Sequence, residues 1–448
     1  MKQKTPKIPK LGESQDKNHP QAVHFVGIGG IGMSALAQYY ASEGWQVSGS
    51  DVAASELTDG LKKKKIRVYI GHARENITKP NLVIYSAAVD EKSPERAEAR
   101  KRRIPQMSYA EALGGLTKQY TTIAVAGSHG KSTTTAMMAT VLMKAGFDPT
   151  VIIGTKTKEL KGNFRKGKSD WLIIEADEYN RSFHQYYPDV AVVTGVDKEH
   201  LDTYNDYKGV VAGFGKFLKN VAADGIAVIN ANDRGAREAA KKTKAKVVLY
   251  NRIPFKKRKL SVMGQHNQEN AEAVSKTARA LGISQIVIDK ALAGYQGAWR
   301  RLEKIRAPKT IFNADIYSDY AHHPTEIRAT LQALRDAHPE RKIICVFQPH
   351  QQDRFNRLFE DFKKTLAGAI ADLMIVLPIY IVTGREASKL DRTAKDLVEE
   401  LNHPGVLHFN DLGEIMFSLD MFSLERPVVV FMSAGDLDQR LRTYCKIN

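Results

Sequence analysis

The stretch AGSHGKSTT, residues 126–134, constrains the fold of this chain more than any other part of the sequence. It follows the apolar run YTTIAVA and precedes a run of helical character, which predicts a strand, a glycine-rich loop and a helix. Gly-Lys-Ser at such a place is typical of a loop whose backbone amides cradle phosphate, although only two residues separate the glycines here. The predicted nucleotide-binding loop comprises Gly127, Ser128, His129, Gly130, Lys131, Ser132 and Thr133.

Two candidate metal ligands follow later apolar runs of the same predicted sheet. Glu175 ends the run DWLIIE, and His200 follows the run DVAVV. Taken alone, Glu175 could cap the following helix and His200 could be an ordinary loop histidine. However, the carboxyl ends of parallel strands meet at one edge of a sheet. There, beside the loop, they suit metal ions that bridge phosphate oxygens. We therefore predict Lys131, Glu175 and His200 as catalytic residues, and Ser132, Glu175 and His200 as metal ligands.

A second glycine-rich turn, GIGGIGMSA, follows the apolar run AVHFV near the start of the chain. Gly27, Gly29 and Gly32 give the spacing G-x-G-x-x-G, which lets a backbone approach a diphosphate at a helix N-terminus. Asp51 closes the next predicted strand, near the place where a dinucleotide fold holds its ribose acid. From these residues alone the turn could bind NAD, bind another diphosphate, or hold no ligand.

Predicted strands and helices alternate in three successive series along the chain, and the sequence has no internal repeat of the length found in solenoid proteins. We predict an α/β protein with three domains, near residues 19–117, 118–297 and 298–448, behind a flexible basic tail at residues 1–18. The first and third domains should be Rossmann-like, and the central domain should be a parallel sheet like that of P-loop ATPases.

The sequence is basic, with 67 Lys and Arg against 50 Asp and Glu and a formal net charge of +17. Its basic runs, at 62–65, 100–103, 241–246 and 256–259, are scattered and are not interleaved with aromatic residues, so we expect no nucleic-acid partner. No apolar run reaches the ~18 residues that span a bilayer, and the first residues do not resemble a secretory signal. With only two cysteines, a cytoplasmic protein without membrane insertion is expected.

Together the motifs resemble the Mur ligases, the ATP-dependent ligases of peptidoglycan precursor synthesis. The matching blocks occur in the family's order over about residues 22–355. They are VHFVGIGGIGMSALA, AVAGSHGKSTTTAM, IIEADEYNRSF, HLDTY, GQHN, RRLE, DYAHHPTEI and FQPH. The resemblance implies that the first glycine turn holds the diphosphate of UDP-N-acetylmuramate, that the second holds ATP, and that Mg²⁺ or Mn²⁺ assists. HLDTY and FQPH favour the branch that adds L-alanine through an acyl phosphate.

The resemblance also implies further site residues. For ATP these are His266, Asn267, Asn270, Arg301 and Asp319. For the sugar nucleotide they are Gly27, Gly29, Gly30, Gly32, Asp51, His72, Ser86, Ser182 and Phe183. For the amino acid they are His323, His350, Arg354 and Tyr380. A monomer or weak homodimer is expected.

Some residues depart from the family pattern and keep alternatives open. FQPH is followed by Gln351, Gln352 and Asp353 before Arg354, where the family has another arginine and an aromatic residue. An aspartate near the amine could favour glycine or serine over alanine, and RRLE is also found in the ligase that recycles murein tripeptide. Lys216 lies near a lysine that later Mur ligases use, but it is assigned no role. Outside the family, a NAD(P)-dependent oxidoreductase would leave the Gly-Lys-Ser loop unused.

Overall fold

The computed structural model describes residues 21–251, 258–306, 314–368, 370–381, 392–415 and 426–445, so the predicted tail lies outside the described residues. The chain divides into two compact units, and the first contains two sheets while the second contains one. The first unit runs to Leu260 and includes Glu269–Gln296, and the second consists of Ser261–Gln268 and the chain from Gly297 onward.

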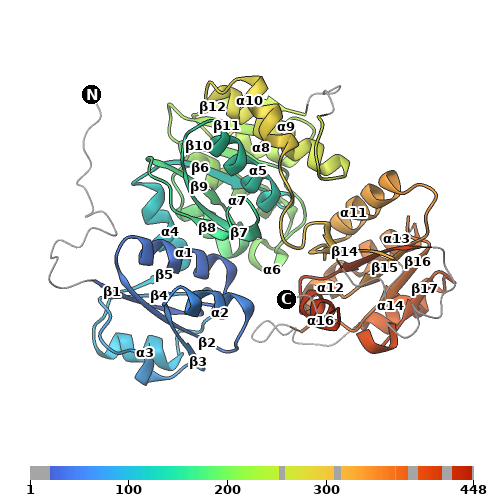
Figure 1. Ribbon diagram of the computed structural model, residues 1–448, viewed down its shortest axis with the longest axis horizontal. Helices are drawn as coiled ribbons and strands as arrows, with labels where there is room; N and C mark the ends of the chain where they lie inside the picture. Colours follow the sequence, from blue (N-terminus) through green and yellow to red (C-terminus); the bar gives the residue numbers. More distant parts are fainter. Residues whose placement is uncertain are drawn as a thin grey trace. The chain divides into compact units, whose positions relative to one another are not determined.

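The first sheet has five parallel strands in the order β3-β2-β1-β4-β5 (Figure 1). Its strands are β1 (Ala22–Val26), β2 (Gln46–Asp51), β3 (Arg67–Ile70), β4 (Leu82–Tyr85) and β5 (Gln106–Ser108). Between them run α1 (Ile31–Ser42), α2 (Glu56–Lys63), the 3-10 helix η1 (Arg74–Asn76) and α3 (Pro94–Lys101), and α4 (Tyr109–Thr117) follows β5. The strand order reverses beside β1, so the first glycine turn lies where open parallel sheets bind ligands.

The second sheet has seven strands in the order β12-β11-β10-β6-β9-β7-β8, and all neighbours are parallel except the β7–β8 hairpin. Its strands are β6 (Thr121–Ala126), β7 (Thr150–Thr157), β8 (Gly162–Arg165), β9 (Trp171–Glu175), β10 (Val190–Val193), β11 (Ile226–Asn230) and β12 (Lys246–Tyr250). Its helices are α5 (Lys131–Lys144), η2 (Tyr179–Gln185), α6 (Leu201–Tyr204), α7 (Tyr207–Lys219), α8 (Arg234–Ala240), α9 (Gln265–Ala280) and α10 (Gln285–Ala293). Strand β6 ends in the phosphate loop and lies between β9 and β10, whose ends carry the candidate ligands.

The third sheet, in the second unit, has the order β13-β14-β18-β15-β16-β17, with β13 antiparallel to β14 and all other neighbours parallel. Its strands are β13 (Glu303–Ile305), β14 (Asp315–Asp319), β15 (Ile343–Phe347), β16 (Leu373–Val376), β17 (Val406–His408) and β18 (Val428–Met432). Its helices are α11 (Pro324–Ala337), α12 (Gln352–Arg357), α13 (Phe359–Ala367), α14 (Ala394–Leu401) and α16 (Leu437–Tyr444).

Burial explains why these residues form these strands. Every residue of β10, β15 and β18 is buried, as expected for parallel strands covered by helices on both faces. The α/β fold with three parallel-sheet domains is therefore confirmed, while the exact domain boundaries stay a prediction. Among the described helices, none combines the length and apolar character needed to cross a bilayer.

Candidate active site

The phosphate loop keeps its shape because two of its glycines have no room for a side chain. Gly127 and Gly130 have φ angles of 144° and 79°, which L residues rarely adopt. A Cβ on Gly127 would lie 1.9 Å from the hydroxyl oxygen of Thr194, and one on Gly130 would lie 2.5 Å from Oδ1 of Asn270. The structure therefore places Asn270, a predicted ATP residue, against the loop.

Lys131 begins α5 and is held by the loop and by a buried carboxylate. Its Nζ donates to the carbonyl oxygen of Gly127 at 2.7 Å and lies 2.8 Å from Oε2 of Glu178. Burial alone would lower the pKa of Lys131, but the charges of Glu178, Asp177 and Glu175 together outweigh it and raise that pKa. Burial raises the pKa of Glu178, because Lys131 and His200 offset only part of its desolvation. Sequence reasoning missed Glu178, three residues after the chosen Glu175.

Glu175 is fixed at the end of β9 by two donors. Its Oε1 accepts the Ser132 hydroxyl at 2.9 Å, and its Oε2 accepts the backbone N–H of Gly154 at 2.9 Å. A Cβ on Gly154 would lie 2.8 Å from the same carboxylate, so a side chain at this position would displace the Glu175 carboxylate. The structure thus brings together Ser132 and Glu175, two of the three predicted metal ligands.

His200 belongs to a separate cluster. Its backbone is left-handed, with φ of 53°, and its Nε2 lies 3.8 Å from Oε1 of Glu178. Ligand atoms of Asp177, Glu178 and His200 lie within 4.8 Å of one another, a spacing that a metal ion could bridge. The candidate site therefore has two oxygen-rich sets on the same sheet edge, one with Ser132 and Glu175 and one with His200.

The side chain of Phe183, a residue predicted for the sugar side, is fully buried, so only its backbone could serve that role. It stacks between His184 and Phe217, with ring centroids 4.9 Å and 5.0 Å away, and so belongs to the core. Its neighbour Ser182 is part-buried and donates its hydroxyl to the carbonyl oxygen of Tyr179 at 2.9 Å. Ser182 stays a candidate for the sugar side.

Replacing Phe183 with alanine tests this structural role. We expect F183A to lower the free energy of unfolding by about 3–5 kcal/mol, since it leaves a cavity in a stacked aromatic core. Urea denaturation measures this loss, and Y187A, which truncates a ring that is 42% exposed, should cost far less. Equal stability of F183A and the unmodified protein would contradict the assignment.

The first glycine turn is held by the end of β2. Asp51 accepts the backbone N–H of Gly29 at 2.8 Å, and a Cβ on Gly29 would lie 2.8 Å from the same carboxylate oxygen. Asp51 therefore supports the turn. Gly27, with φ of 85°, lies against Ser86, and Gly32 lies against the hydroxyl of Tyr109. Among the described residues no side chain caps α1 at Gly30, which leaves the amides of its first turn available to an anion.

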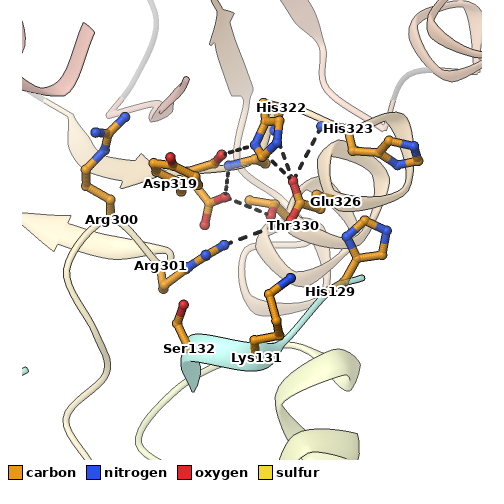
Figure 2. Close-up of polar contacts among 12 residues, drawn as sticks. His129, Lys131, Ser132, Arg300, Arg301, Asp319, His322, His323, Glu326 and Thr330 are labelled. Carbon is orange, nitrogen blue, oxygen red and sulfur yellow. Dashed lines mark hydrogen bonds and ion pairs between the residues drawn. The ribbon is translucent and has the colours of Figure 1, made fainter. Parts of the chain in front are cut away.

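In the second unit, Asp319 holds the RRLE motif and the turn that follows β14 (Figure 2). Its carboxylate accepts the backbone N–H groups of Leu302 at 2.6 Å and Ala321 at 2.8 Å. Burial raises the pKa of Asp319 to about 6, against the opposing charge of Arg301. Arg301 lies 3.9 Å from Glu326 and over the ring of Tyr320, so Arg301 and Asp319 lie in one network.

His266 and Asn267 belong to the second unit and begin α9. Burial, together with the charge of Arg301, lowers the pKa of His266 to about 4, so its ring is neutral at physiological pH. Asn267 donates from Nδ2 to the carbonyl oxygen of Met263 at 2.7 Å.

Three of the four predicted amino-acid residues meet beyond β15. Nη1 of Arg354 lies 3.4 Å from Nδ1 of His350, and the His350 ring stacks on Tyr380 at 5.6 Å. The fourth, His323, is buried at the start of α11, where its Nδ1 accepts the backbone N–H of Thr325 at 3.3 Å. The neighbouring His322 lies beside this group, with its ring 5.9 Å from that of His350.

Comparison with known proteins decides the family. The model of the Mur ligase family catalytic domain matches residues 22–121, the Mur ligase middle domain matches 125–278, and the Mur ligase glutamate ligase domain matches 300–435. The chain belongs to the Mur ligase family.

Full-length relatives agree with this membership. This Mur ligase is 38% identical to the UDP-N-acetylmuramate–L-alanine ligase of Aquifex aeolicus, over 94% of this chain and 97% of that one. It is 34% identical to the enzyme of that name from Alkaliphilus metalliredigens, over 95% and 97%. The crystal structure of UDP-N-acetylmuramate-alanine ligase from Thermotoga maritima has a TM-score of 0.79 at 29% identity, over 96% and 99%. A murein peptide ligase from Psychrobacter arcticus, at 21% identity, shows the shared fold alone.

The unusual residues before Arg354 have structural partners in this Mur ligase. Gln352 is buried and donates to the carbonyl oxygen of Arg392 at 2.6 Å. The carboxylate of Asp353 accepts from Arg357 at 2.7 Å. The carboxylate suspected of favouring glycine or serine is therefore paired within its own helix. Lys216 is exposed on α7.

Proposed function

We propose that this chain is the ligase that joins L-alanine to UDP-N-acetylmuramate at the expense of ATP, in the cytoplasm, where ATP and the sugar nucleotide are available. One observation carries the proposal. The Gly-Lys-Ser loop, with Lys131 and the Ser132–Glu175 pair, lies at one sheet edge in a chain that aligns almost end to end with ligases of that name.

The chemistry requires activation of a carboxylate, which is a poor electrophile. A muramoyl carboxylate oxygen attacks the γ-phosphorus of ATP, ADP leaves, and an acyl phosphate forms. The amine of L-alanine then attacks the acyl carbon, phosphate leaves, and the amine loses a proton. Two anions must meet in the first step, so the charge of Lys131 would screen and align them. The loop amides and Asn270 would hold the phosphates.

The carboxylate sets of the site fit Mg²⁺, which prefers oxygen ligands. Ser132 and Glu175 would hold one ion, and Asp177, Glu178 and His200 would contribute to a second. Glu178 is a buried carboxylate that already lies beside the positive charge of Lys131, and such a carboxylate is stabilised by positive charge. When bound, the ion neutralises charge on the transferred phosphoryl group. The protein's part is to fix these oxygens before substrate arrives.

Arg354 would bind the carboxylate of the incoming amino acid, a task that suits a guanidinium. We expect R354A to raise the KM for L-alanine about 30-fold, ~2 kcal/mol, with the KM for ATP unchanged. Steady-state kinetics with one substrate varied at a time measure this. R357A, on the same helix but paired with Asp353, is the control and should change KM by less than about twofold. Equal effects of the two variants would count against the role of Arg354.

The identity of the amino acid needs a direct test. The protein is incubated with ATP, Mg²⁺ and UDP-N-acetylmuramate, and separately with L-alanine, glycine, L-serine or the L-Ala-γ-D-Glu-diaminopimelate tripeptide. Mass spectrometry of the sugar nucleotide should show a product with L-alanine at the highest kcat/KM. A product formed only with the tripeptide would assign the chain to the recycling branch instead.

A further inference from the structure

A carboxylate in the first domain has no exposed surface and yet is surrounded by polar groups. Glu95, in the first turn of α3, is fully buried. Its Oε2 accepts the Ser50 hydroxyl at 2.6 Å and lies 2.9 Å from Nδ1 of His72. Its Oε1 accepts Nδ2 of Asn76 at 2.7 Å and lies 3.4 Å from Nε2 of His24. Side chains from β1, β2, η1 and the loop before η1 therefore converge on one buried acid.

Glu95 is charged in this setting. Burial by itself would raise its pKa, but the contact with His24 and the hydrogen bonds from Ser50 and Asn76 outweigh burial and lower it. A buried charge is costly unless it is fully bonded, so this arrangement costs more than an apolar core of the same volume. Glu95 has no role in the reaction proposed above, so its buried charge must serve another purpose.

His72 is the contact of Glu95 that reaches the surface. Its side chain is 18% exposed, whereas those of Glu95 and His24 are not exposed at all. Since Nδ1 of His72 faces a carboxylate, that nitrogen carries the proton. This leaves Nε2 as the ring nitrogen without a bond to any residue that the structure describes. The carboxylate thus fixes both the tautomer and the orientation of the ring.

The same cluster is bonded to the first glycine turn. The carbonyl oxygen of Ser50 accepts the backbone N–H groups of Gly27 at 2.8 Å and Ile28 at 2.9 Å. Asn76, which donates to Glu95, also donates to the carbonyl oxygen of Gly71, the residue before His72. Glu95 therefore ties the His72 segment and the glycine turn into one framework.

We propose that Glu95 is a positioning residue for the sugar nucleotide: it holds His72 so that Nε2 faces the diphosphate at the glycine turn. The inference rests on the proposed function, because it takes UDP-N-acetylmuramate as the ligand. With Nδ1 held by the carboxylate, Nε2 is the ring nitrogen that is placed to meet a phosphoryl oxygen. Glu95 itself touches no substrate.

A double-mutant cycle tests this, with the dissociation constants of UDP-N-acetylmuramate and ATP measured by calorimetry. We expect E95Q, which keeps the shape and removes the charge, to weaken UDP-N-acetylmuramate binding about tenfold. ATP binding should change less than about twofold. In a protein that already carries H72A, adding E95Q should raise the dissociation constant of UDP-N-acetylmuramate by less than about twofold. The reason is that His72, through which Glu95 acts, is absent. The matched control E98Q changes an acid one turn further on α3, which pairs with Arg102, and should leave both constants unchanged.

The opposing outcomes are distinct. If E95Q and H72A weaken binding additively, or if E95Q has no effect, Glu95 does not act through His72 and the inference fails while the proposed function stands. If the unmodified protein does not bind UDP-N-acetylmuramate, the proposed function itself fails. If E95Q does not fold, ¹⁵N NMR of histidine-labelled protein decides. Nδ1 of His72 must be protonated, and the Nε2 resonance must move when UDP-N-acetylmuramate is added; an unprotonated Nδ1 or an unmoved Nε2 overturns the inference.

Discussion

Replacing Lys131 with methionine should lower kcat about 10³-fold, ~4 kcal/mol of transition-state stabilisation. Lys131 starts α5 with its ammonium group between the loop carbonyl of Gly127 and the buried carboxylate of Glu178. The proposed reaction brings two anions together, so the charge of this lysine acts most strongly as the phosphoryl group is transferred. Phosphate release under saturating substrates measures the loss, and K144M, at the other end of α5, should leave kcat unchanged.

The neighbouring acid supplies a sharper control for this variant. K131M leaves Glu178 buried beside an apolar side chain, which destabilises the fold by itself. The double variant K131M/E178Q removes that unpaired charge and should melt at a higher temperature than K131M. We expect it to remain as inactive as K131M, because the phosphates still lack their cation. Recovery of activity in the double variant would mean that Lys131 serves only to neutralise Glu178.

The second large effect is expected at Glu175. E175Q should lower kcat about 10²-fold to 10³-fold and raise the Mg²⁺ concentration needed for half-maximal rate. Glutamine can still accept one of the two bonds from Ser132 and Gly154, so the loop keeps its shape while the charge that would hold the ion is lost. Rates measured across a Mg²⁺ titration separate the two effects.

A surface acid serves as the control for Glu175. E238Q makes the same change on α8, where Glu238 pairs with Lys241 in solvent, and should alter neither kcat nor the Mg²⁺ dependence. An unchanged Mg²⁺ requirement in E175Q, together with normal kcat, would remove Glu175 from the metal site and leave the cluster around His200 as the candidate.

Much of the fold could be predicted because apolar runs and glycine turns are local signals. The runs that became β1, β6, β9 and β10 each lead into a loop that the sequence had marked as functional. Strands β5, β13 and β17 were missed, since each has only three residues with at most one of them buried, which gives no apolar run. The family pattern placed Gly130 and Asn270 in one ATP site, but only the structure shows that they are in contact, since no spacing links residues so far apart.

The site was harder to predict where several elements converge. Glu178 follows Glu175 by three residues in the same motif, and only the fold shows that it faces Lys131. Phe183 lies in a motif with site residues but points into the core, because motif membership does not fix side-chain direction. The cluster around Glu95 joins residues up to 71 positions apart, from His24 to Glu95, and left no signal in the sequence.

An isotope transfer tests the central claim most directly. UDP-N-acetylmuramate labelled with ¹⁸O in its carboxylate is incubated with the protein, ATP, Mg²⁺ and L-alanine, and the released phosphate is analysed by mass spectrometry. If the carboxylate is activated as an acyl phosphate, each phosphate released with product carries one ¹⁸O. Phosphate without label, or release that continues when UDP-N-acetylmuramate is left out, would show that water attacks ATP and would contradict the ligase mechanism.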